Sequence, residues 1–321
     1  MVFSVFLPWK KDTSSCFLSF FHGRKTENAP GSLSTRLRMN LYLTDYLCVM
    51  KFSTVINIPK APFELQPCEQ MLFTGSCFAE RIGTRFFEEK FRAMVNPFGV
   101  MYNPASVLHT VERVERPVDT LAMTLGTNRV YVEKSSGEIV DNCQKRPQSL
   151  FYERELSIDE CVEFLSRAVE KALSRNANTK IIVTVSPIRY AKYGYHESQL
   201  AKAVLLLAAD RLISLFPKIA YYFPAYEIVN DELRDYRFYE ADMLHPNAQA
   251  VEYIWERLQP ALLSEKARQF IQEWKPIKEA LAHKPFNPEA EQYKTFMAAT
   301  RNMAEALQEK YPEMELHLPE Q

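Results

Sequence analysis

Strand-like runs of β-branched residues alternate along this chain with segments of helical periodicity, and this alternation limits the folds that it can adopt. Ile181–Val185 (IIVTV) is a continuous run typical of a buried parallel strand. Before it, Ser157 and Glu160 form a capping box that predicts the start of a helix, and a long amphipathic segment begins after it near Leu200. Strands that alternate with helices indicate βαβ units, so we expect a three-layer α/β/α body with a parallel sheet.

The composition is that of a globular protein and argues against two classes of partner. Of the 321 residues, 47% are hydrophobic and 25% are charged, and the formal net charge is −1. Phosphate binding needs clustered Lys and Arg, and no basic block is present, so we expect no nucleic-acid partner. No run approaches the roughly 18 apolar residues of a membrane span, so we expect no membrane partner.

The cysteines are spaced irregularly. They are Cys16, Cys48, Cys68, Cys77, Cys143 and Cys161. No C-x-x-C pair is present, so the usual zinc and thioredoxin-like signatures are missing, and we expect no metal and no cofactor. In a large chain this usage predicts reduced thiols and a cytoplasmic protein.

The chain divides into three segments by pattern. Residues 1–49 mix Ser, Thr and Arg with isolated aromatics and show no sustained period, whereas a tidier pattern opens at Met50. We expect 1–49 to be a disordered leader or an upstream extension, with an ordered N-terminal arm as the alternative. Residues 50–261 are expected to form the α/β domain. Residues 262–321 show only helical patterns and are expected to pack on it as a helical C-terminal extension.

Ser76 is the first candidate for chemistry. It follows Gly75 at a turn between the apolar run Met71–Phe73 and a helical segment. A hydroxyl in that place lies at a helix N-terminus, where free N–H groups favour a developing oxyanion. A plain N-cap serine is the alternative.

Asp242 and His245 form the second candidate. Of the six histidines, only His245 has a carboxylate three residues earlier. On a turn, that spacing lets the carboxylate reach Nδ1 of the imidazole and leaves Nε2 free as a general base. A surface aspartate and an unrelated loop histidine remain the alternative.

Several short sequence motifs resemble those of one family. Gly75–Ala79 spells GSCFA, the name motif of the GSCFA family, which itself resembles the SGNH (GDSL-like) hydrolase superfamily. Further matching words include NPFG at 96–99, TVSP at 184–187, RDYRFY at 234–239 and DMLHP at 242–246. The resemblance runs from about Met50 to the C-terminus. It implies a flavodoxin-like sheet of the SGNH hydrolase type and a Ser76–His245–Asp242 triad that acts on acyl esters.

The same resemblance suggests donors for the oxyanion. The amides of Ser76 and Gly99 match the first two blocks of the superfamily, and Gly126 begins the third. Asn128, in that third block, has a side-chain amide suited to donation. Asn103 is the competing candidate.

Substrate contacts are predicted at Asn103, Arg189 and Gln144. Arg189 follows a strand end directly, and arginine suits bidentate recognition of anionic or sugar groups. Gln144 stands where family members carry a histidine. The stretch 105–123 is shorter than in those members, on the side that shapes the pocket.

Two other interpretations stay open. Cys77 lies at the same helix N-terminus as Ser76, where thiolates are favoured, although we expect its side chain to pack between helix and sheet. The second alternative is that the chain is not an enzyme but a non-catalytic carbohydrate- or peptide-binding module on the same fold. For the enzyme, we expect a small-molecule or glycan acyl ester as substrate, in hydrolysis or acyl transfer.

A chain that begins at Met50 is expected to keep the melting temperature of the full chain, because residues 1–49 contribute few contacts to the body. Thermal unfolding followed by circular dichroism measures this. A fall of several degrees on truncation would show that the leader belongs to the fold.

Overall fold

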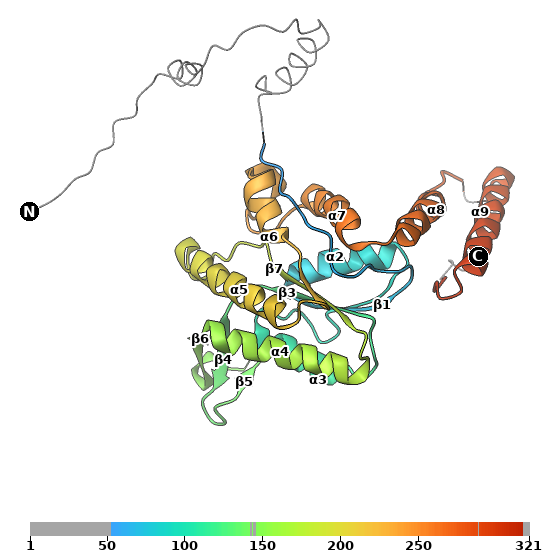
Figure 1. Cartoon of the computed structure of the whole chain (residues 1–321). Coiled ribbons are helices and arrows are strands. Elements are labelled where there is room, and N and C mark those ends of the chain that lie inside the picture. The colour runs from blue at the N-terminus through green and yellow to red at the C-terminus, as the bar shows by residue number, and fades with distance from the viewer. Residues whose placement is uncertain (1–52, 142, 144–145, 288, 317–321) are drawn as a thin grey trace, which may run out of the picture. The chain divides into compact units, whose positions relative to one another are not determined.

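The computed structural model describes residues 53–141, 143, 146–287 and 289–316 (Figure 1). The chain from Ser53 onward forms one compact unit. The expected leader, 1–49, and the predicted substrate residue Gln144 lie outside the described residues.

Five parallel strands form the central sheet. They are β1 (Gln70–Gly75), β2 (Arg92–Val95), β3 (Thr120–Leu125), β7 (Lys180–Val185) and β8 (Ala220–Tyr222). Their order across the sheet is β2-β1-β3-β7-β8, with every neighbouring pair parallel. Counted along the chain this is the 2-1-3-4-5 order of flavodoxin-like folds, so the predicted parallel sheet is confirmed. The order reverses between β1 and β3, and ligands of such sheets bind at the carboxyl ends of the strands beside that reversal.

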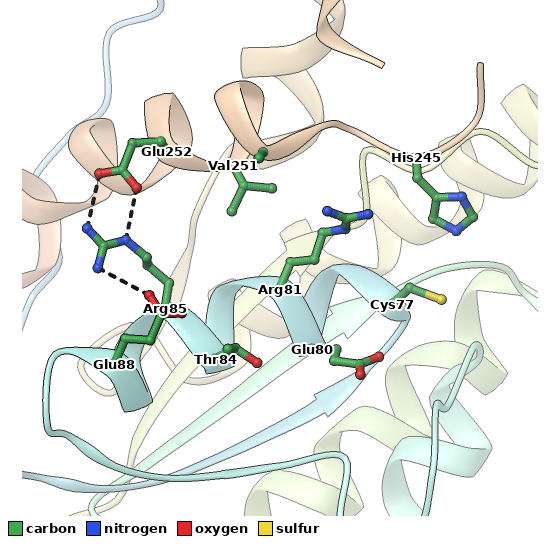
Figure 2. Close-up of a pocket in the computed structure, with 10 residues that line it drawn as sticks. Cys77, Glu80, Arg81, Thr84, Arg85, Glu88, His245, Val251 and Glu252 are labelled. Carbon is green, nitrogen blue, oxygen red and sulfur yellow. Dashed lines mark hydrogen bonds and ion pairs between the residues drawn. The ribbon is translucent and has the colours of Figure 1, made fainter. Parts of the chain in front are cut away.

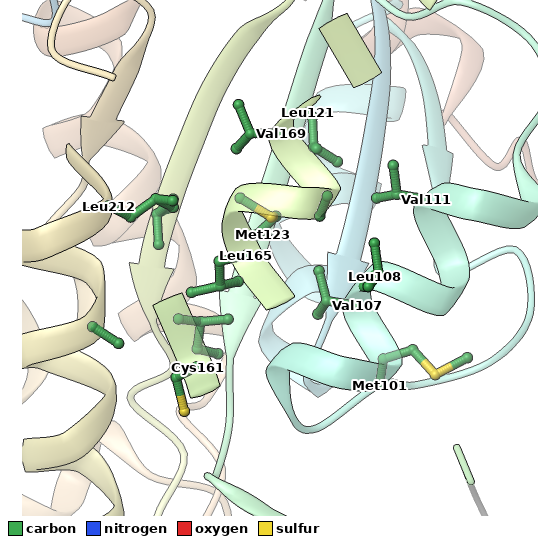
Figure 3. Close-up of a cluster of buried hydrophobic side chains, with 14 of the residues drawn as sticks. Met101, Val107, Leu108, Val111, Leu121, Met123, Cys161, Leu165, Val169 and Leu212 are labelled. Atoms are coloured by element: carbon green, nitrogen blue, oxygen red, sulfur yellow. The ribbon is translucent and has the colours of Figure 1, made fainter. Parts of the chain in front are cut away.

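Helices cover both faces of the sheet (Figure 1). One face carries α3 (Pro104–Arg113), α4 (Ile158–Arg175) and α5 (Tyr195–Leu215), and the other carries α2 (Cys77–Glu88) and α7 (Ala248–Leu262). The side chains of successive residues in β3 point alternately to the two helical layers. Leu121 and Met123 pack with α3, α4 and α5 (Figure 3), whereas Ala122 packs with α2 and α7. The expected three-layer α/β/α architecture is therefore confirmed.

The start of α4 illustrates how local chemistry sets a helix. Ser157 Oγ accepts the Glu160 amide at 3.2 Å, and Glu160 Oε2 accepts the Ser157 amide at 2.8 Å. This is the predicted capping box, which satisfies two amides that have no partner within the helix. Leu165 and Val169 then recur on the buried face, so the helix is anchored to the sheet by burial of that stripe.

A small antiparallel sheet was not expected from the sequence. It contains β4 (Arg129–Glu133), β5 (Ile139–Val140) and β6 (Phe151–Glu155), in the order β5-β4-β6. Only Val130 and Val132 of β4 are buried, and they join the core beneath α4. With two apolar residues on one face, the pattern is too short to separate from a loop. Short helical turns lie at Gln148–Leu150, α6 (Ala225–Glu227), Ile228–Leu233 and Tyr236–Phe238.

The C-terminal part is helical, as expected. It comprises α8 (Glu265–Leu281) and α9 (Glu291–Lys310). Trp274 of α8 donates from Nε1 to the carbonyl of Glu88 at 2.9 Å, and Lys278 pairs with the buried Glu89 at 2.6 Å. These bonds hold α8 against the carboxyl end of α2. Among the described residues, no helix combines the length and the hydrophobicity that crossing a bilayer requires.

We predict that Gly75→Ala destabilises the protein by at least about 3 kcal/mol, because backbone strain and a backbone clash coincide there. Gly75 has φ +141°, and a Cβ at this position would lie 2.1 Å from the carbonyl oxygen of Thr124 on the paired strand. Gly137→Ala is the matched control, since its φ is +72° but the added Cβ meets nothing within 4 Å. Its cost is expected to be about 1 kcal/mol. Equal losses in urea unfolding would contradict the role of the clash.

Candidate active site

A pocket of about 200 Å³ lies at the carboxyl ends of three central strands. Ser76 follows β1, Gly126 follows β3 and Ser186 follows β7, and all three line it. Leu244 and His245 close it from the loop before α7. The strand order and the sequence motifs therefore indicate the same location for the site. Two of the predicted triad residues, Ser76 and His245, line this cavity, which we call the Ser76 pocket.

Ser76 is the N-cap of α2. Its Oγ accepts the amide of Phe78 at 3.3 Å and lies 3.1 Å from Oγ1 of Thr124, and the residue is only 1% exposed. The N-cap interpretation thus describes its resting hydrogen bonds. Because the residue also forms part of the pocket wall, the capping role and a chemical role are compatible.

Asp242 and His245 form the predicted pair. Asp242 Oδ2 lies 2.6 Å from His245 Nδ1, while Oδ1 accepts the amides of Leu244 at 2.8 Å and His245 at 3.0 Å. The two backbone bonds and the His245 ring lower the pKa of Asp242 to about 2. The carboxylate therefore stays ionised and fixes the proton of the imidazole on Nδ1, which leaves Nε2 as the basic nitrogen.

Arg189 holds the loop that carries this pair. Its amide donates to the carbonyl of Leu244 and its Nη1 to that of Met243, both at 3.0 Å. The guanidinium stacks 4.3 Å from the ring centroid of Tyr195. The sequence suggested that Arg189 binds substrate. In the structure it lines the Ser76 pocket, but its guanidinium is engaged in positioning the loop around Met243, whose φ is +59°.

The structure directs none of the three predicted oxyanion donors into the pocket. The Ser76 amide continues the β1–β3 ladder and donates to Thr124 O at 3.0 Å. Gly99 is exposed in a turn after β2, and its amide donates to Asn96 O at 2.9 Å. Asn128 is buried, and its Nδ2 donates to Leu156 O at 2.9 Å. The expectation for these groups is corrected, because each of them is committed to a backbone carbonyl.

The neighbour of Asn103 reaches the pocket instead of Asn103. Asn103 is buried as the N-cap of α3, and its Oδ1 accepts the Ser106 amide at 3.0 Å. Tyr102 lines the pocket, and its carbonyl accepts the amides of Gly126 at 2.9 Å and Thr127 at 2.8 Å. The predicted substrate role of Asn103 is thus replaced by a structural one. The segment chosen from the sequence reaches the pocket, but Tyr102 lines it and Asn103 does not.

Cys77 is more accessible than expected. Its thiol is half-buried, lies 3.9 Å from the hydroxyl of Tyr102, and lines two cavities. The second cavity is an open groove of about 590 Å³ between α2 and α7 (Figure 2), where Arg81 and Glu252 contribute charge. Cys77 and His245 line both cavities, so they mark the junction of the Ser76 pocket and the groove. The expected packing role of Cys77 is corrected accordingly.

Lys202 is a site residue that the sequence analysis missed. It lies on α5, is 2% exposed, and donates from Nζ to the carbonyls of Gly126 at 2.7 Å and Ser186 at 2.8 Å. Burial lowers its pKa to about 7. A lysine beside Ala201 and before Leu205, on the buried face of a predicted helix, was the available signal.

Among the described residues, no cluster of three or more His, Cys, Asp or Glu side chains is placed to hold a metal ion.

Lys202→Met is expected to change how stability depends on pH. A lysine whose pKa falls from 10.5 in the unfolded chain to about 7 in the fold destabilises the fold wherever only the unfolded state holds the proton. That penalty shrinks as pH rises. Between pH 7 and 9 the wild type should therefore gain about 2 kcal/mol of unfolding free energy relative to Lys202→Met. Urea unfolding at both pH values measures the difference, and parallel curves would refute a neutral buried amine.

The GSCFA family profile matches residues 70–118 and 110–258, and the profile of the C-terminal domain of GSCFA domain proteins matches 274–318. No curated protein matches significantly.

Three solved structures are similar at low identity. A putative platelet activating factor from Streptococcus pneumonia is 14% identical, with a TM-score of 0.41 and with 72% of this chain and 99% of that chain covered. A putative GDSL-like lipase from Parabacteroides merdae is 15% identical, with a TM-score of 0.42 and coverages of 63% and 98%. A carbohydrate esterase family 3 protein from Talaromyces cellulolyticus is 11% identical, with a TM-score of 0.33 and coverages of 67% and 99%.

The fold is established here by the strand order and the two helical layers. The two matched segments of the first profile span more than half of the sequence and include the Gly75–Ala79 motif and the Asp242–His245 loop. The resemblance noted from the sequence is therefore confirmed: this chain belongs to the GSCFA family.

Proposed function

We propose that this protein is a serine ester hydrolase in which Ser76 is the nucleophile, His245 the general base and Asp242 its orienting carboxylate. One observation carries the proposal. An imidazole fixed by a carboxylate at 2.6 Å lines the same strand-end pocket as a helix-capping serine. The expected substrate is a small-molecule or glycan acyl ester, with hydrolysis or acyl transfer as the outcome.

The proposed chemistry follows from these positions. His245 Nε2 removes the hydroxyl proton of Ser76 while Oγ attacks the ester carbonyl. The tetrahedral intermediate collapses, the alcohol departs with the proton from His245, and Ser76 carries the acyl group. Water, activated by the same imidazole, then releases the acid; an acceptor alcohol in its place gives transfer.

One feature of the resting site must change during this cycle. Ser76 Oγ is bonded to Thr124 Oγ1 in this structure, so it has to rotate toward His245 when substrate binds. Catalytic hydrogen bonds commonly tighten only in the substrate complex. The oxyanion then lies near the first turn of α2. There the amides of Phe78 and Ala79 are bonded to Ser76 Oγ and Ser76 O, so the Cys77 amide, directly after the nucleophile, is the expected donor.

Two rival functions have support of their own. Cys77 is more exposed than Ser76 and lines the same pocket, which favours a thiol nucleophile. The amides of Ser76 and Gly99 and the side-chain amide of Asn128 donate hydrogen bonds to backbone carbonyls and not into the pocket. This favours a non-catalytic carbohydrate- or peptide-binding module. Site variants separate both from the serine mechanism.

Ser76→Ala and His245→Ala are each expected to lower kcat by roughly 10³-fold or more, and the double variant should be scarcely worse, because the two residues share one proton transfer. Asp242→Asn should cost less, since it leaves the base in place. Cys77→Ser should keep most activity. Hydrolysis of short acyl esters measures all four.

Three results would redirect the assignment. Loss of activity in Cys77→Ser but not in Ser76→Ala would make the protein a thiol enzyme. Ligand binding that survives Ser76→Ala, with no turnover by the wild type, would indicate a binding module. Additive losses in the Ser76 and His245 double variant would show that they do not act in one step.

A further inference from the structure

We propose that the Ser76 pocket receives the acyl group of the substrate, and that this acyl group ends in a carboxylate that binds Nζ of Lys202. The inference deepens the proposed function and rests on it for the identity of the acyl group. It assigns a ligand to a buried cation that the proposed triad does not use.

The size and the walls of the pocket suit a short acyl chain. Its volume is about 200 Å³, which is room for about six water-sized groups. Ile188, Tyr190 and Leu244 supply apolar wall surface beside Ser76. The rings of Tyr102 and Tyr190 meet edge to face at 5.8 Å and make one wall rigid. A chain of a few carbons attached at Ser76 therefore fits within this pocket.

Among the described residues, the pocket lining contains basic side chains and no carboxylate. Arg189, Lys192, Lys202 and His245 contribute to its lining, and no aspartate or glutamate of the described residues does. Lys192 is paired with Glu153 at 2.8 Å, and His245 with Asp242, which lies outside the lining.

Lys202 differs from these groups in its surroundings. Its hydrogen-bond partners are the carbonyls of Gly126 and Ser186, which are dipoles and carry no net charge. Arg189 likewise donates to a carbonyl, but its guanidinium is partly exposed to water. Among the described residues of the lining, Lys202 is thus the basic side chain that is both fully buried and bonded to uncharged groups.

A buried ammonium without a counter-ion is unfavourable, and an anion that reaches it is bound strongly. An ammonium has three donors, and the two carbonyls use two, so one N–H of Lys202 remains for a ligand. A carboxylate satisfies both requirements, because it accepts that hydrogen bond and compensates the charge. The N-terminus of α2, at Ser76, adds partial positive charge to the same cavity.

The low pKa of Lys202 is consistent with this role. Without an anion, burial disfavours the charged amine. A carboxylate beside Nζ reverses the balance and restores the ammonium.

The test compares two esters of one alcohol, ethyl butyrate and monoethyl succinate, whose acyl chains differ only at the far end. Ethanol release by the full chain should show a kcat/KM at least about 10-fold higher for the succinate ester, the ratio that one charge-assisted hydrogen bond supplies. Lys202→Met should reduce that preference by about 10-fold. Lys192→Met is the matched control, since its ammonium lines the same pocket but is already paired, and it should keep the preference.

A binding measurement makes the test independent of turnover. Calorimetry with succinamate and butyramide, which are amides that differ only in the terminal carboxylate, should show tighter binding of succinamate to the wild type and to Ser76→Ala, and loss of that difference in Lys202→Met. Circular dichroism checks the fold of Lys202→Met. Lys202→Gln, which keeps a donor without the charge, should lose the same difference and replaces it if the fold is lost.

The outcomes separate the two proposals. Turnover of ethyl butyrate that needs Ser76, with no preference for the succinate ester and no Lys202-dependent binding of succinamate, overturns the carboxylate assignment and leaves the esterase intact. Binding of succinamate that depends on Lys202, with no turnover of either ester, supports the carboxylate site and overturns the esterase.

Discussion

The close approach of β1 and β3 at Gly75 is the constraint on which the candidate site depends. Gly75 pairs with Thr124, and the next amide, that of Ser76, donates to the Thr124 carbonyl at 3.0 Å. No side chain fits at Gly75, because a Cβ would fall 2.1 Å from that carbonyl. The ladder therefore continues one residue past the strand and fixes Ser76 at the first turn of α2. The strand order reverses at the same place, so the edge that the topology opens to ligands is the edge that presents the serine.

The hydrogen-bond contacts predicted correctly are those whose partners are close in sequence. Asp242 reaches His245 across one turn, and Ser157 caps α4 through Glu160. Such contacts are encoded by spacing, because three residues on a turn or at a helix start can meet in few other ways. The parallel sheet was also predictable, since Ile181–Val185 is a run that only a strand covered on both faces buries.

The predictions that failed concern residues whose hydrogen-bond partners are far away in sequence. Gly99 and Asn128 were assigned by resemblance, and their donors are taken by carbonyls whose positions depend on the tertiary fold. Lys202 was missed for the same reason, because its contacts also depend on the tertiary fold. Its hydrogen-bond partners, Gly126 O and Ser186 O, come from two different strand ends, 76 and 16 residues away along the chain. No sequence spacing encodes such a contact, although a lysine on an apolar helix face indicates that some partner exists.

Ser76 has two roles that differ in energy, and this difference makes the mechanism testable. As the N-cap of α2 it accepts the Phe78 amide, and removal of such a cap costs about 1 kcal/mol of stability. As a nucleophile it would account for a 10³-fold effect on rate, which is about 4 kcal/mol of transition-state free energy. Loss of the cap alone leaves the folded fraction of a stable domain almost unchanged, so it cannot imitate the larger effect. If Ser76 only capped α2, its replacement by alanine would lower the melting temperature by a few degrees and leave any turnover intact. Comparing the loss of stability with the loss of turnover in Ser76→Ala therefore distinguishes a catalytic serine from a structural one.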